Sequence, residues 1–282
     1  MLCRIGEVEI WRILEINAPF RSPEQLFPTA GPDVTALIEA HAPGTICMRT
    51  RKLILPVQGF LIRTAAHLIL VDTCVGNHKT CPGFADWHHR DTDRFRDALK
   101  AAGAGWADVD YVLCTHLHVD HIGWNTQLQD GRWVPSFPKA RYLLPAADRE
   151  RLESQASQVY RESVLPVIEA GQAEWVDGAY QIGDCVHLIP TPGHTCGHVS
   201  VLVGSNGSEA IITGDALHTS AQCHFPDWHF VYDDDPERAA VSRRALLENA
   251  TERDARVLGS HFRLPSLGRV RAAGDAFRWV PD

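Results

Sequence analysis

The 282-residue sequence predicts an α/β protein in which two sheets pack between outer helices. Short apolar runs, many of which end in Gly, Asp, His or Thr, have the length and composition of buried strands. Segments with helix-start signals lie between these runs in both halves of the chain. Hydrophobic residues make up 45% of the sequence and charged residues 22%, which is typical of a folded globular protein.

The clearest predicted strands cover residues 68–72, 111–116, 186–191, 210–215 and 256–261. Each is a short apolar run whose last residues are polar or small.

Three helices are predicted between the strands. Asp93 is placed to cap the first, and Asp235 followed by Pro236 opens another. The remaining helix begins near Ala146 and continues until Pro166 interrupts it. Residues 17–56 contain several prolines and no clear periodicity, which predicts a loop and a short helix near the surface.

The length of the chain favours a single domain over residues 1–282. We expect an N-terminal strand and loop region at 1–56 and a metal-binding core at 57–282. The net charge of −8 argues against nucleic acid as a partner, because such binding depends on Lys and Arg.

Location can also be predicted from charge placement. Arg4, Glu7 and Glu9 fall where a secretory signal would be apolar, so a cytoplasmic protein is expected. The most apolar segment is interrupted by Arg63 and His67 and is too short to cross a bilayer as a helix. We therefore expect no contact with a membrane.

The eight cysteines are scattered and form no CxxC pair. A chain of this size does not need disulfides to hold a core together. We interpret the cysteines as buried or half-buried thiols in a reducing compartment.

The central motif is THLHVDHIGWN, which follows the apolar run YVLC directly. It places His116, His118, Asp120 and His121 within six residues. Three imidazoles and a carboxylate are costly at the end of a buried strand unless something pairs with them, and a metal ion does so. Zinc accepts imidazole nitrogen and carboxylate oxygen, and a set without cysteine disfavours a closed structural zinc site.

This HxHxDH motif resembles the signature of the metallo-β-lactamase superfamily. Later motifs follow in the expected order: TPGHTCGH contains His194, TGDAL contains Asp215 and GSHF contains His261. The segment VDT contains Asp72, which the resemblance makes a carboxylate beside the metal ligands. The similarity begins near Gly59, extends to the C-terminus and implies a four-layer αβ/βα sandwich, the metallo-β-lactamase fold.

The resemblance implies two divalent metal ions per chain, with zinc the expected metal. The implied metal ligands are His116, His118, Asp120, His121, His194, Asp215 and His261. The first ion would be bound by His116, His118 and His194, and the second by Asp120, His121 and His261. Asp215 would be shared by both.

The implied reaction is hydrolysis by a hydroxide that bridges the two ions. Two ions about 3.5–4 Å apart lower the pKa of a bound water from 15.7 toward about 7. Asp120 is then a catalytic candidate as well as a ligand, because it could pass a proton to the leaving group.

Within the superfamily, the chain resembles the acyl-homoserine lactone lactonases and methyl parathion hydrolase. TPGHTCGH is similar to the lactonase motif TPGHTPGH, and the tail GSHFRLPSLGRVRAAGDAFRWVP is similar to the C-terminal segment of methyl parathion hydrolase. The resemblance implies a lactone or carboxylic ester as substrate, and a homodimer. Phosphotriesterase and β-lactamase activities are alternatives within the class, and a non-enzymatic metal-binding protein is the alternative outside it.

Two positions depart from the lactonase pattern. Lactonases typically have a tyrosine three residues after the bridging aspartate, where this chain has His218. A neutral imidazole there could donate a hydrogen bond to the substrate oxygen, which makes His218 a second catalytic candidate; the alternative is a hydrogen bond to loop backbone. Cys196 replaces a proline and is interpreted as a packing thiol. His198 is expected to brace the loop of His194.

Several aromatic and imidazole side chains lie near the motif loops. They could form an apolar pocket wall or belong to the core, and the sequence leaves both open. These residues are Trp124, Phe225, Trp228, His229 and Phe230.

Overall fold

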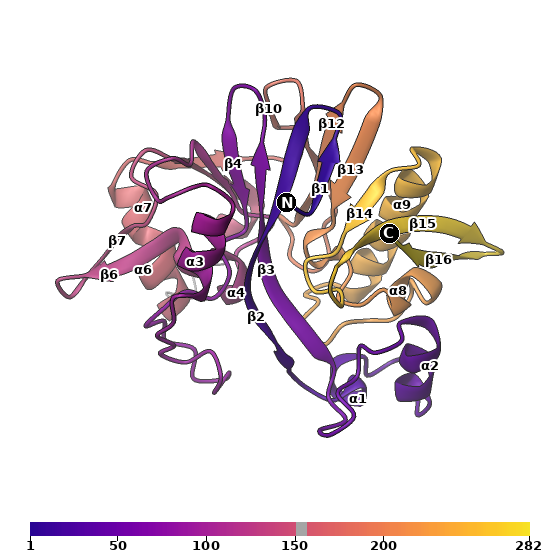
Figure 1. The fold of residues 1–282 in the computed structure, drawn as a ribbon. Helices are drawn as coiled ribbons and strands as arrows, with labels where there is room; N and C mark the ends of the chain where they lie inside the picture. The colour runs from indigo at the N-terminus through magenta and orange to yellow at the C-terminus, as the bar shows by residue number, and fades with distance from the viewer. Residues whose placement is uncertain (151–156) are drawn as a thin grey trace. The chain divides into compact units, whose positions relative to one another are not determined.

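The computed structural model describes residues 1–150 and 157–282 (Figure 1). The chain divides into two compact units. Unit 1 comprises Met1–Glu15 and Val57–Asp177, and unit 2 comprises Ile16–Pro56 and Gly178–Asp282. The assignment of residues 1–282 to a single domain stays a prediction.

Unit 1 is built on a seven-stranded mixed sheet with the strand order β1-β2-β3-β4-β5-β8-β9. The strands are β1 (Cys3–Ile5), β2 (Val8–Pro19), β3 (Ile54–Arg63), β4 (Leu68–Val71), β5 (Tyr111–Leu113), β8 (Arg141–Pro145) and β9 (Ala173–Val176). From β4 to β9 neighbouring strands are parallel, whereas β3 and β4 are antiparallel. All four residues of β4 are buried, as expected of a strand inside a parallel sheet.

The remaining elements of unit 1 are short. They are α3 (Arg94–Ala101), α4 (Val119–Ile122), the 3₁₀ turns η1 (Gly123–Asn125) and η2 (Ala146–Asp148), the hairpin β6 (Thr126–Gln129) and β7 (Arg132–Pro135), α6 (Gln158–Ser163) and α7 (Leu165–Glu169). Helix α3 buries Phe95 and Leu99, which are four residues apart and therefore share one face.

Unit 2 contains the second seven-stranded sheet, in the order β10-β11-β12-β13-β14-β15-β16. The strands are β10 (Gln181–Ile182), β11 (Val186–Pro190), β12 (Val199–Ser205), β13 (Ser208–Ile212), β14 (Arg256–Leu258), β15 (Leu267–Ala273) and β16 (Ala276–Pro281). Only β13 and β14 are parallel among these described pairs. The last two strands form the yellow hairpin of Figure 1.

The helices of unit 2 are α1 (Pro23–Leu26), α2 (Val34–His41), the 3₁₀ turn η3 (Gly214–Ala216), α8 (Ala221–His224) and α9 (Pro236–Glu252). Helix α9 begins with Pro236 in its first turn, and the Asp235 carboxylate accepts a hydrogen bond from the N–H of Arg238. Its buried face contains Leu246, Leu247 and Ala250, which pack in a core cluster with sheet and loop residues of the same unit.

The predicted strands are confirmed, but each ends before its polar residues. β5 ends at Leu113 and β14 at Leu258, so His116 and His261 lie in the loops that follow. The helices predicted after Asp93 and Asp235 are α3 and α9. Residues 17–56 contain the ends of two strands as well as α1 and α2, so the prediction of a loop and one short helix was incomplete.

The helix predicted from Ala146 to Pro166 was wrong as a continuous element, because Ser157 has extended backbone (φ −66°, ψ 155°) at the start of α6. The described residues contain η2 at its start and α6 near its end, and residues 151–156 lie outside the described part of the chain. Pro166 lies in the first turn of α7, where its missing N–H costs no helical hydrogen bond. Across the described residues, every helix is too short or too polar to span a bilayer.

Candidate metal centre

The first group of site residues follows β5 in unit 1. His116 is fully buried, and its Nδ1 lies 3.1 Å from Oγ1 of Thr115. The Thr115 hydroxyl donates to Asp72, so it acts as acceptor toward His116. This arrangement fixes the proton of His116 on Nδ1 and directs the lone pair of Nε2 away from Thr115.

His121 is held in the same way from α4. Its Nδ1 lies 2.8 Å from Oδ2 of Asp72, and a carboxylate can only accept there. Asp72 also accepts from the backbone N–H of Thr115 at 2.8 Å, so three donors fix this carboxylate. Asp72 has a φ of 59°, in the left-handed region that Asp and Asn tolerate better than most residues.

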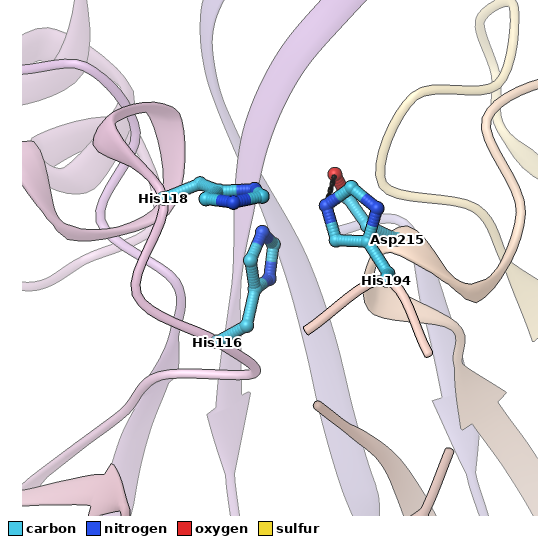
Figure 2. Close-up of side chains that lie close together, drawn as sticks. All are labelled: His116, His118, His194 and Asp215. Carbon is cyan, nitrogen blue, oxygen red and sulfur yellow. Dashed lines mark ion pairs between the residues drawn. The ribbon is translucent and has the colours of Figure 1, made fainter. Parts of the chain in front are cut away.

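His118 and Asp120 complete this half of the site. His118 occupies the N-cap position of α4, and its ring meets the ring of His116 edge to face, as Figure 2 shows. The Asp120 carboxylate is 12% exposed, and its Oδ2 lies 3.8 Å from Nε2 of His121. Unit 1 thus gathers His116 with His118, and Asp120 with His121, each as a pair whose ligand atoms lie within 4.8 Å.

The second group belongs to unit 2, and Asp215 lies at its centre. Oδ2 of Asp215 lies 3.2 Å from Nε2 of His194, the contact dashed in Figure 2. Oδ1 lies 3.0 Å from Nε2 of His261. One carboxylate therefore faces two imidazole nitrogens with different oxygens, an arrangement compatible with a ligand shared by two ions.

The Nδ1 atoms of these two histidines are also fixed. His261 Nδ1 donates to the carbonyl oxygen of Pro56 at 2.7 Å. His194 Nδ1 lies 2.9 Å from Oδ1 of Asp233, another buried carboxylate. In both residues Nδ1 faces an oxygen acceptor and Nε2 faces Asp215.

The buried carboxylates around His194 in unit 2 stabilise positive charge at that position. Burial acts to lower the pKa of His194, but Asp215 and Asp233 outweigh it and raise that pKa to about 9. Burial also acts to raise the pKa of Asp233, yet contact with His194 keeps it below its ordinary value. Two buried carboxylates around one imidazole favour a cation between them.

The residues therefore fit divalent metal ions. Four of the five histidines have Nδ1 bonded to an oxygen acceptor, which leaves Nε2 as the donor atom. Metal-binding histidines have this second hydrogen bond almost without exception. The donor set is imidazole and carboxylate without thiolate, which matches zinc in an open catalytic site.

His218 and His198 both act on Asp215. Nε2 of His218 lies 3.1 Å from Oδ2 of Asp215, and its ring stacks on Phe230 with centroids 3.4 Å apart. Burial lowers the pKa of His218 to about 4 although Asp215 opposes this, so the ring is neutral at pH 7. Nδ1 of His198 lies 2.8 Å from Oγ1 of Thr191 in the His194 loop, as the predicted bracing role requires, and its Nε2 also accepts a hydrogen bond from the backbone N–H of Asp215 at 2.8 Å.

The interpretation of Cys196 as a packing thiol was wrong. Cys196 is exposed, because it lies at the turn between His194 and His198. The other seven cysteines are buried or half-buried, and none of the eight, all within the described ranges, forms a disulfide. Among the aromatic residues near the loops, Trp124, Trp228 and Phe230 are buried in their units.

Sequence reasoning missed Asp233 and Arg243. Asp233 belongs to an acidic run, DDDP, of which only Asp235 was interpreted, as a helix cap. Arg243 is fully buried on α9, and its position between Ala239 and Leu246 follows the helical spacing of the buried face. That spacing is the signal that could have revealed it.

A family model described as the metallo-beta-lactamase superfamily matches residues 54–261. The match covers well over half of the chain, so the protein belongs to the metallo-β-lactamase superfamily. The family and the fold predicted from the sequence motifs are thereby confirmed.

Among characterised proteins, the chain is similar to N-acyl homoserine lactonases. The lactonase of Bacillus thuringiensis is 29% identical over 205 residues, which cover 69% of this chain and 76% of that protein. A lactonase of Bacillus sp is 31% identical over 177 residues, which cover 58% of this chain. The chain spans 65% of the length of that second relative.

Solved structures show the same fold. AidC, a dizinc quorum-quenching lactonase in complex with a product, aligns with a TM-score of 0.80 and 20% identity over 99% of this chain and 96% of AidC. The hydrolase AbOPH in the beta lactamase superfamily aligns with a TM-score of 0.80 and 22% identity over 99% of this chain and 96% of AbOPH.

Proposed function

We propose that the protein is a metal-dependent hydrolase that binds two divalent ions, zinc in the first place, and opens a lactone or another carboxylic ester. The similarity to N-acyl homoserine lactonases supports a lactone as substrate. The dizinc description of AidC, which has the same fold, supports zinc as the metal.

One observation carries the proposal: His194 and His261 contact different oxygens of Asp215. Because the Nδ1 atoms of both histidines are already bonded to Asp233 and Pro56, the two Nε2 atoms and the Asp215 oxygens are left facing one another as potential metal ligands. We assign one ion to His116, His118 and His194, and the other to Asp120, His121 and His261. Asp215 is shared by the two.

When bound, the two ions would supply Lewis acidity, which makes water nucleophilic at neutral pH and polarises the ester carbonyl. The side chains of the protein would orient the metal ligands and transfer protons. Asp72, Thr115 and Asp233 hold the imidazole rings through Nδ1, so that Nε2 keeps its lone pair for the metal.

Asp120 is the residue that we assign to proton transfer. Its carboxylate is 12% exposed and that of Asp215 is 5% exposed, which favours Asp120 as the acidic group that meets the substrate. The Asp120 carboxylate can take the proton that the attacking water loses and pass it to the alkoxide oxygen as the ester bond breaks. A lactone keeps this alkoxide on the same molecule as the new carboxylate.

His218 is the second proposed catalytic residue. Its Nε2 is directed at Asp215, and its buried Nδ1 has no hydrogen-bond partner among the described residues. If Nε2 donates to Asp215, it orients the carboxylate that both ions share. A hydrogen bond from His218 to the substrate oxygen, as expected from the sequence, stays a prediction.

The test is metal analysis followed by a substrate panel. Purified protein is loaded with zinc, its bound metal is measured, and hydrolysis is compared on acyl-homoserine lactones, aryl esters, phosphotriesters and β-lactams. The proposal expects about two zinc ions per chain and the highest kcat/KM on a lactone or ester. Preference for phosphotriesters would favour the methyl parathion hydrolase-like alternative, and metal binding without any hydrolysis would favour a metal-binding protein.

A further inference from the structure

Asp233 is a fully buried carboxylate that lies outside the seven proposed ligands. Its Oδ1 lies 2.9 Å from Nδ1 of His194, and its Oδ2 accepts a hydrogen bond from the backbone N–H of Phe230 at 3.0 Å. Nη2 of Arg243 lies 3.5 Å from the same Oδ2. The carboxylate is therefore fixed from both sides.

Arg243 is fully buried as well, and it connects three segments of unit 2 to α9. Its Nε donates to the carbonyl of Ala216 at 2.7 Å, next to Asp215. Its Nη1 donates to the carbonyls of Pro226 and Trp228 at 2.6 and 2.9 Å. A buried guanidinium is costly unless it is paired and hydrogen-bonded, and Asp233 supplies the negative charge.

The backbone beside Asp233 is attached to the same loop as His194. The N–H of Asp234 donates to the carbonyl of His194 at 3.2 Å, and the N–H of Asp235 donates to the carbonyl of Gly193 at 2.9 Å. A Cβ on Gly193 would lie 2.1 Å from the backbone nitrogen of Ala239. The start of α9 and the His194 loop are therefore packed backbone against backbone.

We propose that Asp233, fixed by Arg243, is a positioning residue that orients His194 for metal binding. It holds the proton on Nδ1 and aims Nε2 at the space beside Asp215. Arg243 adds a link to the segment of Asp215, so one side chain of α9 braces two proposed ligands. The inference rests on the proposed function, in which His194 binds one of two zinc ions.

The decisive substitution is Asp233→Asn. The amide oxygen is expected to face the two donors Phe230 N–H and Arg243, which leaves the NH₂ group against Nδ1 of His194. Two donors cannot share that contact, so the ring is driven toward the tautomer with its proton on Nε2, which cannot bind zinc. Loss of such a partner typically weakens metal binding about 10–100-fold.

Zinc affinity is measured by titration against a chromophoric zinc chelator, with folding checked by circular dichroism. The wild type should bind two ions. Asp233→Asn should bind one of them about 10–100-fold more weakly and keep the other near wild-type affinity. Glu237→Gln is the matched control, because it removes one exposed negative charge from the same segment, and it should bind both ions as the wild type does.

Asp233→Glu separates positioning from charge compensation. It keeps a negative charge beside Arg243, but its extra methylene displaces the carboxylate from His194. We expect its melting temperature to be closer to that of the wild type than the melting temperature of Asp233→Asn is. One zinc ion should again be bound more weakly than in the wild type. This variant keeps the test valid if Asp233→Asn fails to fold.

Three results would overturn the inference. If Asp233→Asn or Asp233→Glu bound both ions with wild-type affinity, Asp233 would not orient His194 for metal binding. If the affinity for both ions fell equally, Asp233 would have a general structural role and would not act specifically on His194. A wild type that binds no zinc would overturn the proposed function itself, so the two failures can be told apart.

Discussion

The carboxylate of Asp72 accepts a hydrogen bond from Nδ1 of His121 over 2.8 Å, and both side chains are 2% exposed. The same carboxylate accepts two hydrogen bonds from Thr115, one from its backbone N–H and one from its hydroxyl. The Thr115 hydroxyl oxygen in turn accepts a hydrogen bond from Nδ1 of His116. One aspartate therefore sets the orientation of two proposed ligands, although it binds no metal itself.

Asp72→Asn should weaken zinc binding about 10–100-fold. Asn fits the left-handed backbone at this position, so the fold is retained, but its NH₂ group replaces an acceptor among donors. Zinc competition measures the effect, and Asp97→Asn on the exposed side of α3 is the control. Unchanged affinity would contradict the role of Asp72.

Removal of metal should abolish hydrolysis and lower the thermal midpoint. Ions that bind only the folded state stabilise it, by about 2.7 kcal/mol for a ligand at 100 times its Kd. Chelated, dialysed protein is compared with the same protein after zinc is restored, in activity and in differential scanning calorimetry. Full activity without metal, or saturation at one ion per chain, would contradict a two-ion mechanism.

Asp120→Asn should slow esters with poor leaving groups more than activated aryl esters. Only the poor leaving groups need a proton as the bond breaks, and general acid catalysis is typically worth about 10²–10⁴ in rate. The measurement is kcat/KM across aryl esters of graded leaving-group pKa at fixed zinc occupancy. An equal loss on every ester would assign Asp120 to metal binding alone.

Glu15→Gln should destabilise the protein by about 1–3 kcal/mol. Both oxygens of this buried carboxylate accept hydrogen bonds, from the N–H of Val75 at 2.8 Å and from Nε1 of Trp124 at 2.8 Å. A glutamine presents an NH₂ group to one of these donors. Urea unfolding checks the change, with Glu39→Gln, which disrupts a surface pair with Arg51, expected to cost under about 1 kcal/mol. Equal stability of the two variants would contradict the prediction.

His218→Ala should keep zinc bound but lose about 10²–10³ in kcat if the imidazole stabilises developing charge. Metal content, melting temperature and kcat are measured on one preparation. His224→Ala is the control, since His224 stacks on His41 and contacts none of the proposed ligands among the described contacts. Unchanged turnover would refute a catalytic role, and loss of zinc would indicate that His218 supports Asp215.

The proposed ligands could be found in the sequence because each follows an apolar strand within a short motif. His116, His194 and His261 come shortly after β5, β11 and β14. Residues that are neighbours in such a motif remain neighbours in the folded protein, so the strands and the ligands that follow them could be predicted together.

Asp233 could not be predicted in the same way, because its role depends on contacts with residues far away in the sequence. It lies 39 residues from His194 and 10 from Arg243. In the sequence, DDDP is typical of an exposed acidic turn, and nothing local distinguishes Asp233 from Asp234. Only the docking of α9 on the His194 loop buries one and leaves the other exposed.

The close approach of two loops in unit 1 limits how this protein can be engineered. A Cβ on Gly123 would lie 1.7 Å from the carbonyl oxygen of Val75, and one on Gly76 would lie 2.7 Å from the carbonyl carbon of Gly123. Directed evolution cannot exchange these glycines singly, because any side chain collides with backbone that has no room to move. Gly83 faces open space and has no left-handed backbone, so a mutant library can vary that position, whereas positions 76 and 123 should be left as glycine.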